Sequence, residues 1–154
     1  EETARILGQL PSGIHVFHGL PLPNGDADVD HVVVSPSGLF VVETLNWSGR
    51  ASIRDGHLLY DGREPDRNPV DQVRRAAAAL REHLRRAGLT PSIHPVLCLP
   101  RDALAKDSEG VGGVIVCRRP ALPAVLMESV DAPLDAATID RLVKSLHPLT
   151  AEKP

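Results

Sequence analysis

The sequence is poor in aromatic residues, in cysteine and in long apolar runs. Phe, Trp and Tyr make up 3% of its 154 residues, which leaves few side chains that could stack on nucleic-acid bases. Its two cysteines, Cys98 and Cys117, lie in separate apolar segments and are expected to be buried free thiols in strands, with a disulfide or a metal pair as the alternative. No apolar run reaches the roughly 18 residues of a transmembrane helix, so no membrane contact is predicted.

The chain also lacks an excess of positive charge. Its 17 Lys and Arg residues are outnumbered by 20 Asp and Glu residues, and the formal net charge is -3. A general attraction to nucleic acid is therefore not indicated, and such contact must come from a local basic patch. No secretory signal is visible, so a cytoplasmic location is expected. Because the chain starts abruptly at "EETARIL", we expect residues 1–154 to be one domain excised from a longer protein.

The spacing of apolar residues predicts an α/β domain. The predicted order is a short helix over residues 2–10, about five strands with a long helix among them, and a last helix over residues 135–147. Residues 29–44 are a predicted β-hairpin, because two β-branched runs flank a Ser-Pro-Ser-Gly turn. The apolar runs 93–100 and 113–117 are predicted central strands. These elements predict a mixed central sheet flanked by helices on both faces.

The long helix has start and stop signals at both ends. Asn68 can cap it, Pro69 fits its first turn, and Gly88 closes it. Its apolar residues recur at helical spacing, as expected for a helix that buries one face. They are Val73, Ala77, Leu80 and Leu84.

Two carboxylates of the predicted hairpin are expected to lie side by side. Asp30 opens the first arm, whereas Glu43 and Leu45 share one face near the end of the second arm. A hairpin aligns the start of one arm with the end of the other. Neighbouring carboxylates repel each other unless a positive charge lies between them, and Mg²⁺ accepts one or two carboxylates while keeping several waters. The alternative is that both carboxylates are solvated at the sheet edge.

The segment "DADVDHVVVSPSGLFVVETLNWSG", followed by "NPVDQ", resembles the nuclease-related domain, called NERD, a branch of the restriction-endonuclease-like PD-(D/E)xK superfamily. The likeness runs from the first helix to about Leu84. It implies a restriction-endonuclease-like fold, a DNA substrate and a Mg²⁺ or Mn²⁺ cofactor. By this resemblance Asp30 and Glu43 are the metal-binding and catalytic acids, and Gln72 turns toward the site from the start of the long helix. The family also carries an acidic residue on its first helix, a place that Glu1 or Glu2 fills.

Leu45 departs from the family pattern. The resemblance places a lysine there, where it is expected to position the attacking water and to offset negative charge on the phosphate. Leucine has no donor and no charge, so cleavage is predicted to be impaired or lost. Three explanations stay open: a domain that kept binding and lost cleavage, an engineered inactivation, or migration of the charge to an arginine, which stabilises charge but is a poor base. The candidates for migration are Arg50, Arg54 and Arg75.

A basic stripe on the long helix supports an alternative function, a non-catalytic DNA- or protein-binding module. Arg74, Arg81 and Arg85 share one side of the helix and are the predicted DNA-binding residues, with salt-dependent and sequence-independent phosphate contacts. The alternative is an ordinary solvated helix face.

Two further residues are predicted to be structural. His31 points to the sheet face opposite Asp30 and is expected to be a core histidine hydrogen-bonded to the backbone. Trp47 is expected to pack over a loop, although it could instead stack on a base or cover the entrance of the site.

Overall fold

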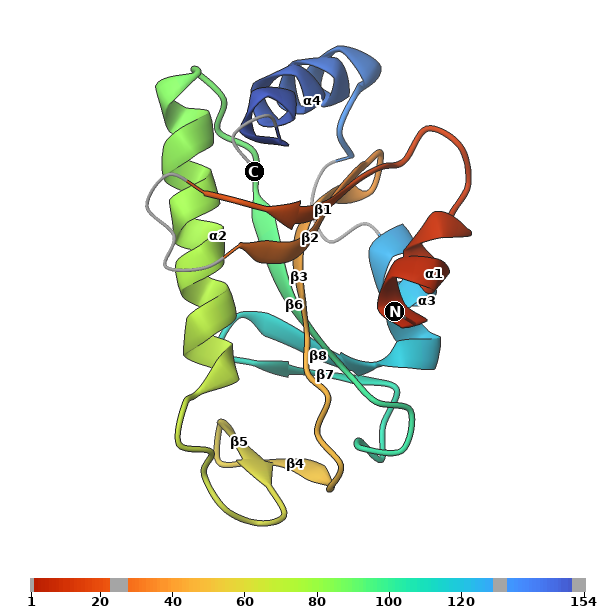
Figure 1. Cartoon of the computed structure of the whole chain (residues 1–154), viewed down its shortest axis with the longest axis vertical. Helices are drawn as coiled ribbons and strands as arrows, with labels where there is room; N and C mark the ends of the chain where they lie inside the picture. Colours follow the sequence, from red (N-terminus) through yellow and green to blue (C-terminus); the bar gives the residue numbers. More distant parts are fainter. Residues whose placement is uncertain (1, 23–27, 129–132, 151–154) are drawn as a thin grey trace.

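The computed structural model describes residues 2–22, 28–128 and 133–150, and Figure 1 shows a central sheet between helices. The sheet has six strands in the order β1-β2-β3-β6-β8-β7, and a separate two-stranded sheet pairs β4 with β5. The strands are β1 (His15–Leu20), β2 (Val29–Ser35), β3 (Gly38–Thr44), β4 (Ala51–Arg54), β5 (His57–Tyr60), β6 (Ile93–Leu99), β7 (Ser108–Val111) and β8 (Val114–Arg118). The helices are α1 (Glu2–Gly8), α2 (Pro69–Arg86), a 3-10 turn (Arg119–Ala121), α3 (Leu122–Met127) and α4 (Ala136–Thr150).

The central sheet is mixed. Strands β1, β2 and β3 pair antiparallel, whereas β6 pairs parallel with β3 on one side and with β8 on the other. The edge strand β7 returns to antiparallel pairing with β8. The predicted mixed sheet flanked by helices is therefore confirmed. No helix in the described part of the chain is long and apolar enough to cross a membrane.

Alternating residues of the hairpin β2–β3 pack into two separate hydrophobic cores, one on each face of the sheet. Val32 and Val41 face a core that includes residues of α2 and α4, whereas Val33 and Phe40 face a core with residues of α1 and α3. Figure 1 shows α2 on one side of the sheet and α1 with α3 on the other. The alternation predicted from a period of two is confirmed, and it determines which face carries each polar side chain of the hairpin.

The structure confirms the predicted signals of α2. The Asn68 side chain accepts a hydrogen bond from the backbone N–H of Val70 at 3.0 Å, and Pro69 occupies the first turn. Gly88 follows the helix with a φ of 77°, a conformation that glycine adopts without steric cost. The predicted apolar stripe is buried, which fixes the rotation of α2 about its own axis.

The predictions for the cysteines and for Trp47 hold as well, and the one for His31 holds for its burial but not for a backbone hydrogen-bond partner. Both cysteines are buried free thiols, and they are register neighbours on β6 and β8. His31 is buried at 4% exposure, and its Nδ1 lies 2.9 Å from Nδ1 of His18 on β1, so the partner found is a second imidazole. Trp47 packs against the core beside Tyr60, with ring centroids 4.7 Å apart.

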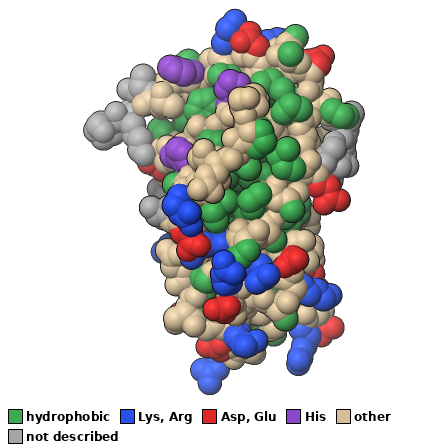
Figure 2. All heavy atoms as spheres, turned by 90° about the vertical axis from the view of Figure 1, so that its right-hand side faces the viewer, with side chains coloured by type: hydrophobic (Ala, Val, Ile, Leu, Met, Phe, Trp, Pro, Cys, Tyr) green, Lys and Arg blue, Asp and Glu red, His purple; other side chains and the backbone are tan. Residues whose placement is uncertain are grey.

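The face covered by α1 and α3 displays apolar side chains. Figure 2 views the molecule from this side and shows hydrophobic groups gathered over its middle. Met127 at the end of α3 is 50% exposed, and Ile6, Leu10, Ile14 and Val16 are half-buried against the underlying core. The carboxylates of the hairpin belong to the other face of the sheet.

Candidate functional site

Asp30 and Glu43 meet at the open end of the hairpin β2–β3. The register pairs His31 with Val42, so the next position along the ladder places Asp30 opposite Glu43. Oδ2 of Asp30 accepts a hydrogen bond from the backbone N–H of Thr44 at 2.9 Å, which fixes this carboxylate. Both acids line one cavity of about 460 Å³. The structure thus brings together the two carboxylates that the strand pattern placed side by side.

The Glu43 carboxyl has an unusual protonation state. Burial, followed by a hydrogen bond with Asp30 and the negative charge of Asp30, raises the pKa of Glu43 to about 8. At neutral pH the Glu43 carboxyl therefore keeps its proton, which relieves repulsion between the two acids. A cation placed between the two carboxylates would replace this proton.

The donor set fits a hard divalent cation with an open coordination sphere. Within the described residues, no cluster of three or more His, Cys, Asp or Glu side chains could hold a metal. Two carboxylates alone suit Mg²⁺ or Mn²⁺, which take oxygen ligands and complete their coordination with water or with substrate oxygens. A closed zinc site would require four protein ligands.

Helix α2 forms one wall of the cavity. Gln72 and Arg75, with Ala76 and Ala79 behind them, all line it, and their spacing of three, four and seven residues puts them on one side of the helix. Gln72 therefore lines the same cavity as Asp30 and Glu43. Arg67, directly before the N-cap, also lines the cavity and was missed by sequence reasoning. Its position next to the Asn-Pro start of α2 was the signal that could have identified it.

Leu45 contributes to an apolar wall. Its backbone N–H donates to the carbonyl oxygen of Cys98 at 3.0 Å, which continues the pairing of β3 with β6 beyond Thr44. The half-buried side chain packs against the core and lines the cavity together with Leu22 and Leu97. The position that the family resemblance assigns to lysine thus faces the carboxylate pair and carries a hydrocarbon.

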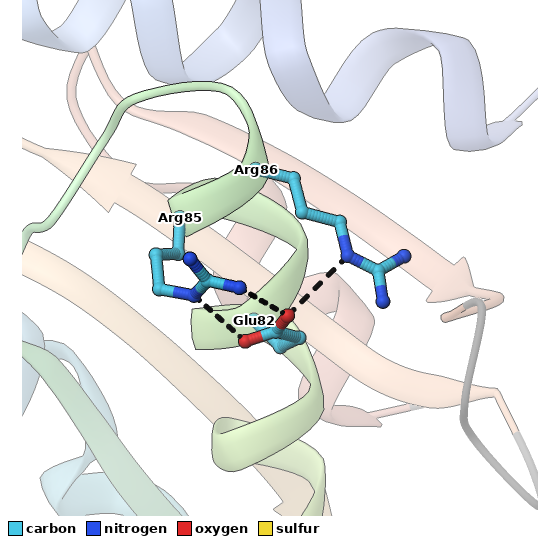
Figure 3. A network of polar contacts seen from close by, with 3 residues as sticks. All are labelled: Glu82, Arg85 and Arg86. Carbon is cyan, nitrogen blue, oxygen red and sulfur yellow. Dashed lines mark hydrogen bonds and ion pairs between the residues drawn. The ribbon is translucent and has the colours of Figure 1, made fainter.

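The predicted DNA-binding stripe lies elsewhere on α2. Arg81 comes nine residues after Gln72, which at about 100° per residue is half a turn around the helix. Arg85 donates two hydrogen bonds of 2.7 and 2.9 Å to Glu82, and Arg86 donates a third of 3.3 Å (Figure 3). These bonds lower the pKa of Glu82 to about 2. Arg74 lies 3.8 Å from Asp71. Part of the stripe's charge is therefore already paired.

Of the three arginines considered as substitutes for the lysine, the structure brings Arg75 to the cavity. Arg50 lies at the start of the β4–β5 hairpin, where its backbone N–H donates to Oδ1 of Asp61 at 2.8 Å. Arg54 is exposed on β4. Neither of these two residues lines the carboxylate cavity.

Glu2, one of the two candidates for the acidic residue of the first helix, does not line the carboxylate cavity. Glu2 of α1 lies on the other face of the sheet, where its Oε2 accepts a hydrogen bond from Arg119 at 3.3 Å. It lines a separate cavity between α1 and α3. Glu1 lies outside the described residues. The hairpin β2–β3 and α2 supply most of the residues that line the carboxylate cavity.

Comparisons with known proteins point to one family. The family model for the nuclease-related domain, NERD, matches residues 1–100. Among solved structures, Pyrococcus furiosus SfsA in complex with Ca²⁺ is similar at 19% identity and a TM-score of 0.29, over 85% of this chain and 49% of that one. The chain thus spans about half the length of that protein. Comparison with curated proteins found no match.

Proposed function

The chain belongs to the nuclease-related domain family, and from this premise we propose that Asp30 and Glu43 hold Mg²⁺ or Mn²⁺ in a DNA-binding domain whose phosphodiester hydrolysis is weak or lost. The observation that carries the proposal is the convergence of the two carboxyl groups in one cavity, at neighbouring positions of the hairpin ladder. DNA is the proposed partner because the family is nuclease-related.

Each residue of the pair has a distinct task in this proposal. Asp30 presents a carboxylate that the Thr44 N–H holds in place. Glu43 gives up its proton when the cation binds, and Gln72 offers an amide that can orient water or a phosphate oxygen from the α2 wall. A bound cation would supply Lewis-acid stabilisation of charge on the phosphate and would lower the pKa of a water ligand.

Leu45 explains why hydrolysis is expected to be weak. No donor or cation projects from this position, so the attacking water lacks one of the groups that would position it. Losing one preorganised charge-stabilising donor typically costs about 10²–10³ in rate. The site is therefore expected to keep cation and DNA binding better than it keeps catalysis.

Calorimetric titration of Mn²⁺ into the metal-free domain at pH 8 tests the cation site. Wild type is expected to bind one ion, and Asp30→Asn and Glu43→Gln are each expected to weaken binding by at least about tenfold, because each removes one of two protein ligands. Glu82→Gln removes a carboxylate from the exposed side of α2 and serves as the matched control. The proposal fails if wild type binds no Mn²⁺, or if both site variants bind it as tightly as wild type.

A second candidate is a module that binds DNA and cleaves nothing. Leu45 is the observation that favours it, because the missing lysine affects hydrolysis more than binding. In that case the basic stripe of α2 is the predicted contact surface. Arg74 is paired with Asp71 and Arg85 with Glu82, whereas Arg81 forms no ion pair within the described residues.

A further inference from the structure

We propose that Arg67 and Arg75 form a phosphate-binding pair beside the carboxylates, which holds a phosphodiester of the DNA backbone over the site. The pair replaces the missing lysine in neutralising the charge of the phosphate. It does not replace the lysine in activating the attacking water. This inference rests on the proposed function, because it names the groups by which the same site holds its substrate. It moves the main DNA contact from the predicted stripe to the cavity.

Position is the first support. Arg67 immediately precedes Asn68, the N-cap that together with the buried Pro69 fixes the start of α2. Arg75 projects from the first turns of the same helix, three residues after Gln72. Both arginines line the cavity that contains Asp30 and Glu43. A phosphate in this cavity would therefore lie between guanidinium groups on the α2 side and the carboxylates on the hairpin side.

Unused hydrogen-bonding capacity is the second support. In residues 2–22, 28–128 and 133–150, neither Arg67 nor Arg75 forms an ion pair, although the cavity that both border is also lined by Asp28, Asp30 and Glu43. Other arginines of α2 differ, because Arg85 and Arg86 are bound to Glu82 (Figure 3). With respect to the described residues, each guanidinium that lines the cavity therefore has donors left for a ligand. Guanidinium groups match phosphate oxygens in a bidentate manner.

Neutralising the phosphate charge falls to the two arginines, because they are the positively charged side chains among the described residues that line the cavity. Leu22, Leu45 and Leu97 line the cavity from the sheet side and offer a phosphate no donor. Arginine stays protonated at any physiological pH, so it can neutralise phosphate charge but cannot accept a proton from water. The pair thus accounts for DNA binding in a site where hydrolysis is expected to be weak.

Binding of a short fluorescein-labelled DNA duplex, measured by anisotropy in Ca²⁺ over a range of salt concentrations, tests the inference. Arg67→Gln and Arg75→Gln are each expected to weaken binding by roughly tenfold and to lower the salt slope by about 1, since each removes a charged hydrogen-bonding contact to phosphate. Arg75→Lys is expected to keep the salt slope but recover only part of the affinity, because lysine keeps the charge and loses the bidentate geometry.

Arg141→Gln provides the matched control, because it removes one exposed arginine from α4 and changes the net charge by the same amount as the cavity variants. Its affinity is expected to stay within twofold of wild type. Arg81→Gln tests the other side of α2. It is expected to lose less DNA affinity than Arg67→Gln or Arg75→Gln, the two cavity variants. The inference is overturned if Arg81→Gln or Arg141→Gln loses as much affinity as the cavity variants, or if the cavity variants bind like wild type.

Mn²⁺ calorimetry on the same proteins separates this inference from the proposed function. If wild type binds Mn²⁺ and the cavity variants keep their DNA affinity, the arginine pair is overturned and the cation site stands. If wild type binds no Mn²⁺ while Arg67→Gln and Arg75→Gln lose DNA affinity, the pair is supported and the cation site is overturned.

Discussion

Leu45→Lys is expected to raise the rate at which the domain nicks supercoiled plasmid DNA in Mn²⁺ at pH 8 by about 100-fold. The substitution restores an ammonium group at a position that lines the same cavity as Asp30 and Glu43. Such a group can hold the attacking water and stabilise charge that develops on the phosphate, and a preorganised donor of this kind contributes about 10²–10³ in rate. Single-turnover nicking assays with excess protein measure the effect on the chemical step.

Two further variants show whether the gain comes from the ammonium group. Leu45→Met introduces an unbranched side chain like that of lysine but without the charge, and it is expected to nick no faster than wild type. Leu45→Lys combined with Glu43→Gln is expected to lose the gain, because a cation ligand is then missing. The account is wrong on this point if Leu45→Lys folds and binds Mn²⁺ but nicks DNA no faster than wild type.

The affinity for Mn²⁺ is expected to rise by about tenfold per pH unit between pH 6 and pH 8 and then to level off. The pKa of Glu43 is raised to about 8 by burial and by Asp30, so below pH 8 a proton must leave before the carboxylate can bind the cation. The cost of removing this proton grows as the pH falls. Calorimetry in buffers of different ionisation enthalpy is expected to show release of about one proton per ion at pH 6.5.

Glu43→Gln gives the matched comparison for this pH dependence. Its residual Mn²⁺ binding is expected to vary little between pH 6 and pH 8, because the titrating carboxyl is gone. An affinity of the wild type that is equally flat over this range, with no proton released, would contradict the shared-proton description of the pair.

Short-range patterns in the sequence predict the part of the site that the hairpin builds. The alternation of side chains along β2 and β3 places Asp30 opposite Glu43 and sends His31 to the other face, and the structure has this arrangement. The signals around Asn68 likewise predict where α2 begins. These features depend on neighbours in sequence or on one tight turn, so the residues themselves specify them.

Features that depend on long-range packing were not predictable in the same way. The sequence shows that Arg75 and Arg81 lie on different sides of α2, but only the packing of the helix on the sheet determines which side faces the cavity. Glu2 does not line the carboxylate cavity, because α1 packs on the opposite face of the sheet. Strand β7 and helix α3 were missed because they have four and six residues, too few for periodicity to be informative.

The most direct test of the central claim is the anomalous diffraction of Mn²⁺ in crystals of the wild-type domain grown with Mn²⁺ at pH 8. The account predicts an anomalous peak between the Asp30 and Glu43 carboxylates, with coordination distances of about 2.0–2.4 Å to both. Carboxylates that still share a proton, or that point apart with no peak between them while Mn²⁺ occupies other sites in the same crystal, would contradict it.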